Sequence, residues 1–159
     1  MFPESVTFSD GLIPKAHGKQ RVMLVDNDTG SANAVAWTLT QNHFAIEHFS
    51  EPGEALKEFK KNQGLYKVII VDARIRGMTC FEFARRIRKL CSKVRIVLLT
   101  DFQISKSEFA KVFPSSQIDD IVVKPTEPGK LIQSVTGLDN SKSSDPVSGV
   151  AQQGLSEHC

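Results

Sequence analysis

Long hydrophobic runs are missing from this sequence of 159 residues. No stretch approaches the roughly 20 apolar residues that a membrane-spanning helix needs. Residues 1–20 contain two prolines and two acidic residues, and they lack the apolar segment of a signal peptide. We therefore expect a cytoplasmic protein with no membrane association.

Cysteine is scarce as well, and neither sign of charge dominates. Cys80 and Cys91 are expected on one helix, about 11 residues and hence ~16 Å apart, which is too far for a disulfide bond. This predicts a reducing, intracellular compartment. The net charge of +2 is too small to argue for binding to nucleic acid or to a membrane surface. The basic run R-R-I-R-K at 85–89 is interpreted as a solvated helix face.

What the sequence does contain is an alternation of short apolar runs and amphipathic segments. Five runs are expected to be strands: residues 22–25, 44–49, 68–71, 95–99 and 121–123. Helices are expected between and after them, at residues 31–41, 52–61, about 83–90, 106–112 and 127–135. Strands that are apolar on both sides indicate a parallel sheet covered on both faces. Right-handed crossovers then make a doubly wound α/β sandwich.

One domain over residues 21–136 accounts for this whole pattern. Residues 1–20 are expected to be a flexible leader. Residues 137–159 turn to Ser, Asp, Gly, Pro and Gln with few apolar side chains, so they are expected to be a flexible tail.

Reactive side chains stand where four of the expected strands end. D-N-D at 26–28 follows the first strand, Asp72 the third, Thr100 the fourth and Lys124 the fifth. Each alone is an ordinary helix cap or turn residue. Together they belong to one edge of a parallel sheet, where functional clefts form.

The chemistry that fits this set is phosphoryl transfer to an aspartate. A carboxylate and a phosphoryl group are both anionic, so catalysis depends on positioning and on neutralising charge. Carboxylates can hold Mg²⁺ together with phosphate oxygens. An ammonium and a hydroxyl can bind the remaining phosphoryl oxygens.

The ordered set of motifs resembles the CheY-like receiver domain of two-component response regulators. The matching stretches are V-D-N-D at 25–28, V-I-I-V-D at 68–72, G-M-T-C-F-E-F at 77–83, V-L-L-T at 97–100 and D-D-I-V-V-K-P at 119–125. The resemblance implies a flavodoxin/CheY-like sandwich of five βα units. It also implies a signalling switch that catalyses its own phosphorylation and dephosphorylation, rather than a metabolic enzyme.

The resemblance assigns a role to each residue at the strand ends. Asp72 would be the phosphoacceptor, Thr100 the switch hydroxyl and Lys124 the phosphoryl-binding lysine. Mg²⁺ would be held by Asp26, Asn27, Asp72 and the backbone carbonyl of Arg74. The phosphoryl group would come from a sensor histidine kinase or a histidine phosphotransfer protein. Output would pass to a protein partner or to an output domain outside this sequence, with dimerisation left open and no direct binding of nucleic acid.

Several positions depart from the usual pattern of that family. Asn27 replaces an acidic metal ligand, so weaker Mg²⁺ binding is expected, and Asp28 either compensates or caps the next helix. Arg76 and Cys80 replace a proline and a glycine and would alter the stiffness of their loop.

Two further departures lie near the expected switch. Asp101 stands where a small residue is usual, and it could obstruct a phosphodonor, repel it or modulate hydrolysis of the acyl phosphate. Ile121 replaces an aromatic residue, so output is expected from movement of the loops and the fourth helix.

Two other interpretations stay open at this point. The first is a docking module that keeps the receiver fold without phosphorylation. The second is a haloacid-dehalogenase-like phosphatase, in which D-N-D-T at 26–29 supplies Asp26 as the nucleophile and Asp28 as the acid and base. Against the phosphatase, its terminal acidic pair should follow Lys124 rather than precede it, and Asp72 would have no role.

Overall fold

The computed structural model describes residues 19–137 of the chain. Five parallel strands form one sheet in the order β3-β2-β4-β5-β6. Their bounds are β2 Gln20–Val25, β3 Phe44–Phe49, β4 Val68–Asp72, β5 Arg95–Thr100 and β6 Asp120–Val123. The predicted strands are confirmed, and most extend one or two residues beyond the apolar run that indicated them.

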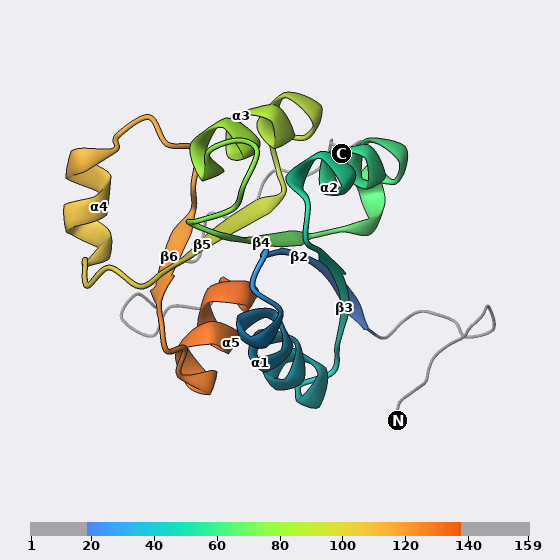
Figure 1. Ribbon diagram of the computed structural model, residues 1–159, viewed down its shortest axis with the longest axis horizontal. Coiled ribbons are helices and arrows are strands. Elements are labelled where there is room, and N and C mark those ends of the chain that lie inside the picture. The colour runs from blue at the N-terminus through green and yellow to red at the C-terminus, as the bar shows by residue number, and fades with distance from the viewer. Residues whose placement is uncertain (1–18, 138–159) are drawn as a thin grey trace, which may run out of the picture.

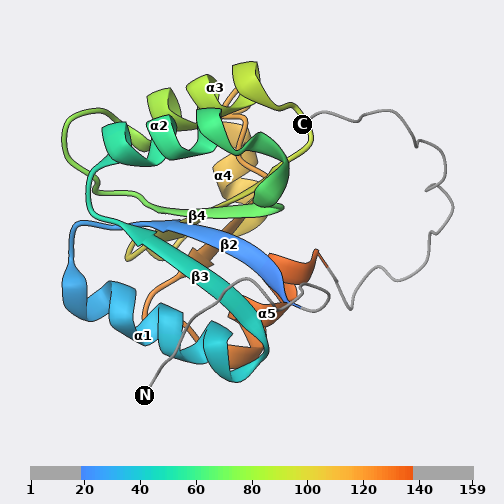
Figure 2. The same ribbon diagram turned by 90° about the vertical axis from the view of Figure 1, so that its right-hand side faces the viewer.

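The helices cover both faces of this sheet, as Figures 1 and 2 show. α1 (Thr29–Gln41) and α5 (Pro128–Thr136) lie on one face. α2 (Pro52–Lys61), α3 (Cys80–Leu90) and α4 (Lys106–Val112) lie on the other, and a short 3-10 turn, η2 (Gln63–Leu65), precedes β4. The doubly wound sandwich predicted from the sequence is confirmed.

Capping side chains explain why two helices begin earlier than their apolar pattern. The Asp28 carboxylate accepts hydrogen bonds from the amides of Gly30 and Ser31, so α1 begins at Thr29. The Thr79 hydroxyl accepts from the amide of Glu82, and α3 accordingly begins at Cys80. A polar cap satisfies backbone donors that an apolar pattern does not report.

The core has two layers, one on each face of the sheet. In β2, Met23 and Val25 join the layer beneath α2 and α3, whereas Val22 and Leu24 join the layer beneath α1 and α5. All four side chains are fully buried. A central strand covered on both faces has no solvent side, which is why its sequence does not alternate.

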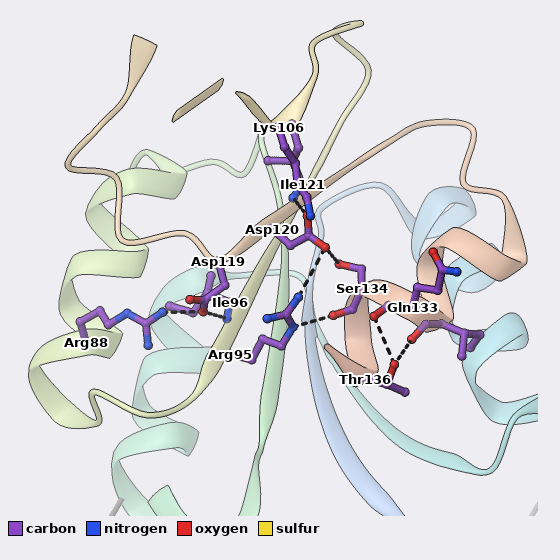
Figure 3. A network of polar contacts seen from close by, with 11 residues as sticks. Arg88, Arg95, Ile96, Lys106, Asp119, Asp120, Ile121, Gln133, Ser134 and Thr136 are labelled. Atoms are coloured by element: carbon purple, nitrogen blue, oxygen red, sulfur yellow. Dashed lines mark hydrogen bonds and ion pairs between the residues drawn. The ribbon is translucent and has the colours of Figure 1, made fainter. Parts of the chain in front are cut away.

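A polar network ties the beginning of β6 to its neighbours (Figure 3). Asp120 accepts a hydrogen bond from the Ser134 hydroxyl at 2.7 Å, and its carboxylate pairs with Arg95 at 3.4 Å and Lys106 at 3.1 Å. Asp120 therefore joins β6 to β5, α4 and α5.

Arg88 corrects the interpretation of the basic run as a wholly solvated face. Its side chain is 15% exposed, and its guanidinium pairs with Asp119 at 2.6 Å. It also donates to the carbonyl oxygens of Val94 and Gln117. Arg88 bends back to satisfy these carbonyls, whereas Arg85 and Arg86 stay exposed and pair with Glu82.

The described part of the chain begins at β2 and ends after α5. Gln20 already belongs to β2, and Gly137 ends α5 in a left-handed conformation with φ 77°. The remainder of the predicted leader and tail, residues 1–18 and 138–159, lies outside the described residues. Within residues 19–137, no helix has the length and apolar character required to cross a membrane.

Candidate phosphoacceptor site

The carboxyl ends of the strands surround a cleft of about 470 Å³. Asp26 follows β2, Asp72 ends β4 and Lys124 follows β6. The cleft is lined by Asp26, Asn27, Asp28, Asp72, Arg74, Arg76 and Lys124. The parallel topology has thus brought together side chains that lie almost 100 residues apart in the chain.

Asp72 lies in this cleft with both carboxylate oxygens engaged. Its Oδ1 accepts a hydrogen bond from the Arg74 amide at 2.8 Å, and its Oδ2 pairs with Nζ of Lys124. The side chain is 7% exposed, so one oxygen faces a fixed backbone donor and the other a fixed positive charge. Such an arrangement orients the carboxylate and balances its charge.

Asp26 is buried next to it, and one of its oxygens has no partner. The Asp28 amide donates to Oδ1 at 2.9 Å, while Oδ2 is buried without a hydrogen bond within the described residues. Burial raises the pKa of the Asp26 carboxyl, the Asp28 amide opposes this change, and the nearby Asp72 carboxylate adds to it.

Asn27 presents a second unpartnered oxygen to the cleft. Its Nδ2 donates to the Ser50 carbonyl at 2.6 Å, which directs the amide so that Oδ1 is buried and unpartnered within the described residues. A buried polar atom without a partner is costly, and two on adjacent residues fit a cation that binds oxygen. This set differs from an all-acidic cluster, and residues 19–137 hold no group of three His, Cys, Asp or Glu side chains suited to a metal.

Neighbouring strand β3 holds these two residues in place. The Asp26 amide donates to the Phe49 carbonyl at 3.0 Å, and the His48 Nε2 lies 2.9 Å from the Asp26 carbonyl oxygen. The contributions of His48 and Ser50 were not predicted from the sequence. The available signal was the parallel pairing of β2 with β3, the first two strands predicted from the sequence. This pairing places the end of β3 beside the acidic turn that follows β2.

Asp28 and Thr100 have local roles in the described structure. Oδ1 of Asp28 caps α1, with bonds of 3.0 Å and 3.3 Å to the amides of Gly30 and Ser31. Thr100 is buried at the same sheet edge but does not line the cleft. Its Oγ1 accepts from the Phe102 amide at 3.1 Å, and its carbonyl accepts from the Lys124 amide at 2.7 Å.

The two loops beside Asp72 are joined by an ion pair that the sequence did not predict. Arg74, in the loop after β4, pairs through its guanidinium with the Asp101 carboxylate in the loop after β5. Asp101 is therefore a balanced charge in this structure. The sequence marked Asp101 as unusual but offered no signal that Arg74 would be its partner.

Two other departures from the family pattern, Ile121 and Cys80, lie in the core or at its border. Ile121 is partly buried and packs against the core layer beneath α2 and α3. Cys80 is a buried free thiol, and burial raises its pKa to about 11. Neither side chain lines the cleft.

Comparisons with known proteins agree with this architecture. The family model for the response regulator receiver domain matches residues 22–136. The chemotaxis response regulator CheY4 of Vibrio cholerae is similar in structure, with a TM-score of 0.66 and 24% identity over 76% of this chain and 98% of that one. A putative response regulator from Chloroflexus aurantiacus has a TM-score of 0.67 and 23% identity over 76% of this chain and 97% of that one.

A third structure, the BeF3-activated DrrB receiver domain, has a TM-score of 0.63 and 22% identity over 76% of this chain and 97% of that one. A search of curated proteins found no match. At these identities the solved structures establish the fold, and the family model establishes the family, which replaces the phosphatase interpretation. The chain belongs to the response regulator receiver domain family.

Proposed function

We propose that this receiver domain accepts a phosphoryl group on Asp72, with Mg²⁺ bound, and changes its affinity for a protein partner as a result. The donor would be the phosphohistidine of a cytoplasmic sensor kinase or of a phosphotransfer protein. The observation that carries the proposal is the position of Asp72, oriented by the Arg74 amide, paired with Lys124 and beside two unpartnered oxygens.

The transfer itself would form one bond and break another. An oxygen of the Asp72 carboxylate attacks phosphorus, the bond between phosphorus and the donor imidazole nitrogen breaks, and that nitrogen keeps the electron pair and takes up a proton from solvent. Lys124 pairs with Asp72 in this structure, and its ammonium would neutralise a phosphoryl oxygen once Asp72 is phosphorylated. Fixed positive charge is the main contribution a protein makes to such a transfer.

The residues that would hold Mg²⁺ are those with free oxygens in the cleft. Oδ2 of Asp26 and Oδ1 of Asn27 are available, and the Asp72 carboxylate and the Arg74 carbonyl would complete the protein ligands. The bound ion would neutralise charge between the acceptor and the phosphoryl oxygens. Two of these ligands carry a negative charge, and that of Asp72 is already paired with Lys124. Asp26 would therefore supply the unpaired negative charge, and Asn27 would be a neutral ligand.

Thr100 supports the switching part of the proposal. Its hydroxyl now accepts from the Phe102 amide, and turning it toward a phosphoryl group on Asp72 would change that bond. The loop from 101 to 105 then leads directly into α4. Because Ile121 is not aromatic, this loop and α4 would carry the change to the surface.

Binding of beryllofluoride, a stable mimic of a phosphoryl group, tests the proposal. The native chain and Asp72→Asn are titrated with beryllofluoride in excess Mg²⁺ and followed by ¹H–¹⁵N NMR. We expect saturable shifts around the cleft in the native chain and none in Asp72→Asn. Shifts that persist in Asp72→Asn would remove Asp72 from its role. No binding by the native chain across a wide Mg²⁺ range would favour the docking module.

A further inference from the structure

We infer that the guanidinium of Arg74 is a second cation for the phosphoryl group, and that Asp101 is the anion it exchanges for that group. The inference deepens the proposed function and rests on it. Its starting point is the ion pair between Arg74 and Asp101, which joins the loops after β4 and β5 beside the acceptor.

Arg74 is well placed to reach a group attached to Asp72. It lies two residues further along the chain, its amide donates to the Asp72 carboxylate at 2.8 Å, and it is one of the residues that line the cleft. The side chain is 72% exposed, so it is free to change rotamer. The backbone of Arg74 therefore stays with the acceptor while its guanidinium can turn between two anions.

The charges favour an exchange when Asp72 is phosphorylated. The Asp101 side chain is 52% exposed, and exposed ion pairs change an equilibrium by about fivefold at most. An acyl phosphate on Asp72 carries about two negative charges where the carboxylate carried one, and it offers several strong acceptor oxygens. Arginine can bind two of those oxygens at once, so the phosphoryl group outcompetes a single exposed carboxylate.

The exchange would also release the loop after β5. While Arg74 holds Asp101, the loop of 101–105 is tied to the loop that follows the acceptor. This loop ends at Ser105, whose side chain caps α4. Freeing Asp101 therefore loosens the segment between Thr100 and α4, next to the bond between Thr100 and Phe102.

Arg76 provides a matched control for this inference. It lines the same cleft and carries the same charge, but it has no ion-pair partner within the described residues. Asp101 should therefore compete with the phosphoryl group for Arg74 and not for Arg76. General repulsion between Asp101 and an incoming anion would not distinguish the two arginines.

The test is the dissociation constant of beryllofluoride in saturating Mg²⁺ for a set of variants. Asp101→Asn should bind about two- to fivefold more tightly than the native chain, because Arg74 is no longer held. The same gain should appear when Asp101→Asn is combined with Arg76→Gln. The gain should disappear in the Arg74→Gln background, where adding Asp101→Asn should leave the dissociation constant of Arg74→Gln unchanged. Thermal unfolding without ligand confirms that each variant is folded.

Two results would overturn the inference, and they differ in what else they affect. A gain of equal size in the Arg74→Gln background would show that Asp101 acts through its own charge alone, and the proposed function would stand. Failure of the native chain to bind beryllofluoride would overturn the proposed function and this inference together. The ¹⁵Nε resonance of Arg74 gives an independent readout, since it should shift on binding and that of Arg76 should not.

Discussion

Asn27 makes a contact in this site that an acidic side chain could not make. Its Nδ2 donates to the Ser50 carbonyl at 2.6 Å, and its Oδ1 remains free in the cleft. A carboxylate has no donor, so an aspartate in the same conformation would turn an oxygen toward the Ser50 carbonyl. The neutral residue is thus built into the contact between the acidic turn and β3.

The first prediction concerns Asn27→Asp. The substitution removes the Nδ2 donor and brings a carboxylate oxygen next to the Ser50 carbonyl oxygen. Without metal, it should therefore lower the free energy of unfolding by about 1 kcal/mol. Mg²⁺ should bind more tightly because the site gains a negative charge. Urea unfolding without metal and calorimetric titration with Mg²⁺ measure the two effects. An unchanged metal affinity would mean that Asn27 is not a ligand.

The second prediction concerns Asp26→Asn. The native carboxylate is buried with an unpartnered oxygen, and burial raises its pKa, so at neutral pH the ionised form costs stability when no metal is present. The variant should be more stable than the native chain without metal, by about 1 kcal/mol. It should also gain no stability from Mg²⁺. Thermal unfolding in chelator and in Mg²⁺ checks both, and Mg²⁺ stabilisation retained by the variant would contradict the ligand assignment.

At this scale the sequence predicts positions better than contacts. Asp26, Asp72 and Lys124 could be placed at one edge because each follows an apolar strand, and the cleft contains all three. The pairing of Arg74 with Asp101 could not be predicted. It depends on the rotamers of two exposed side chains in different loops, and no periodic pattern encodes those.

The elements themselves are held at their ends by polar contacts between partly exposed side chains and loop backbone groups. Arg88 connects the end of α3 to carbonyl oxygens before β5 and β6 and to Asp119. The Asp119 carboxylate also accepts from the Ile96 amide at 2.8 Å. These bonds satisfy backbone groups that neither the sheet nor a helix satisfies.

The third prediction compares two arginines on α3. Arg88→Gln should lower the free energy of unfolding by about 1.5–3 kcal/mol, because it removes charge-assisted bonds to partly buried groups. Arg86→Gln removes an exposed pair with Glu82 and should change stability by about 0.5 kcal/mol or less. Urea denaturation measures both. Equal losses would show that the anchor at Arg88 contributes no more than a surface pair.

The fourth prediction concerns two neighbouring aspartates at β6 (Figure 3). Asp120 pairs with Lys106 at the start of α4, whereas Asp119 pairs with Arg88 on α3. Asp120→Asn should therefore speed amide hydrogen exchange in α4, and Asp119→Asn should leave α4 unchanged. Similar exchange in α4 for both variants would contradict a specific link between Asp120 and this helix.

Strands were easier to predict than helix starts for a physical reason. Burial on both faces produces continuous apolar runs, as in β4, where every residue is buried. Helix starts depend on single capping residues such as Asp28 and Thr79. The hydrogen bonds from Arg88 to loop carbonyl oxygens could not be predicted, since a basic side chain on a helix is usually solvated.

At the scale of the described domain, a small polar site lies at the rim of a sheet that is covered on both faces. The two core layers hold the strands from both sides, so Asp72 and Lys124 keep their positions while the loops after β4 and β5 stay exposed. A change at Asp72 would accordingly be transmitted through those loops and α4 rather than through the sheet. The fold class and the position of the cleft at the strand ends could be predicted from the order of the apolar runs. The ion pair between Arg74 and Asp101 could be seen only in the structure.

The central claim is that Asp72 is the residue that accepts the phosphoryl group. The most direct measurement is incubation of the native chain and Asp72→Asn with acetyl phosphate and Mg²⁺, followed by borohydride reduction and peptide mass mapping. We expect one modified position, Asp72, in the native chain, and no modification in Asp72→Asn or in chelator. Modification at Asp26 or elsewhere, or an unmodified native chain at every Mg²⁺ concentration, would contradict the account.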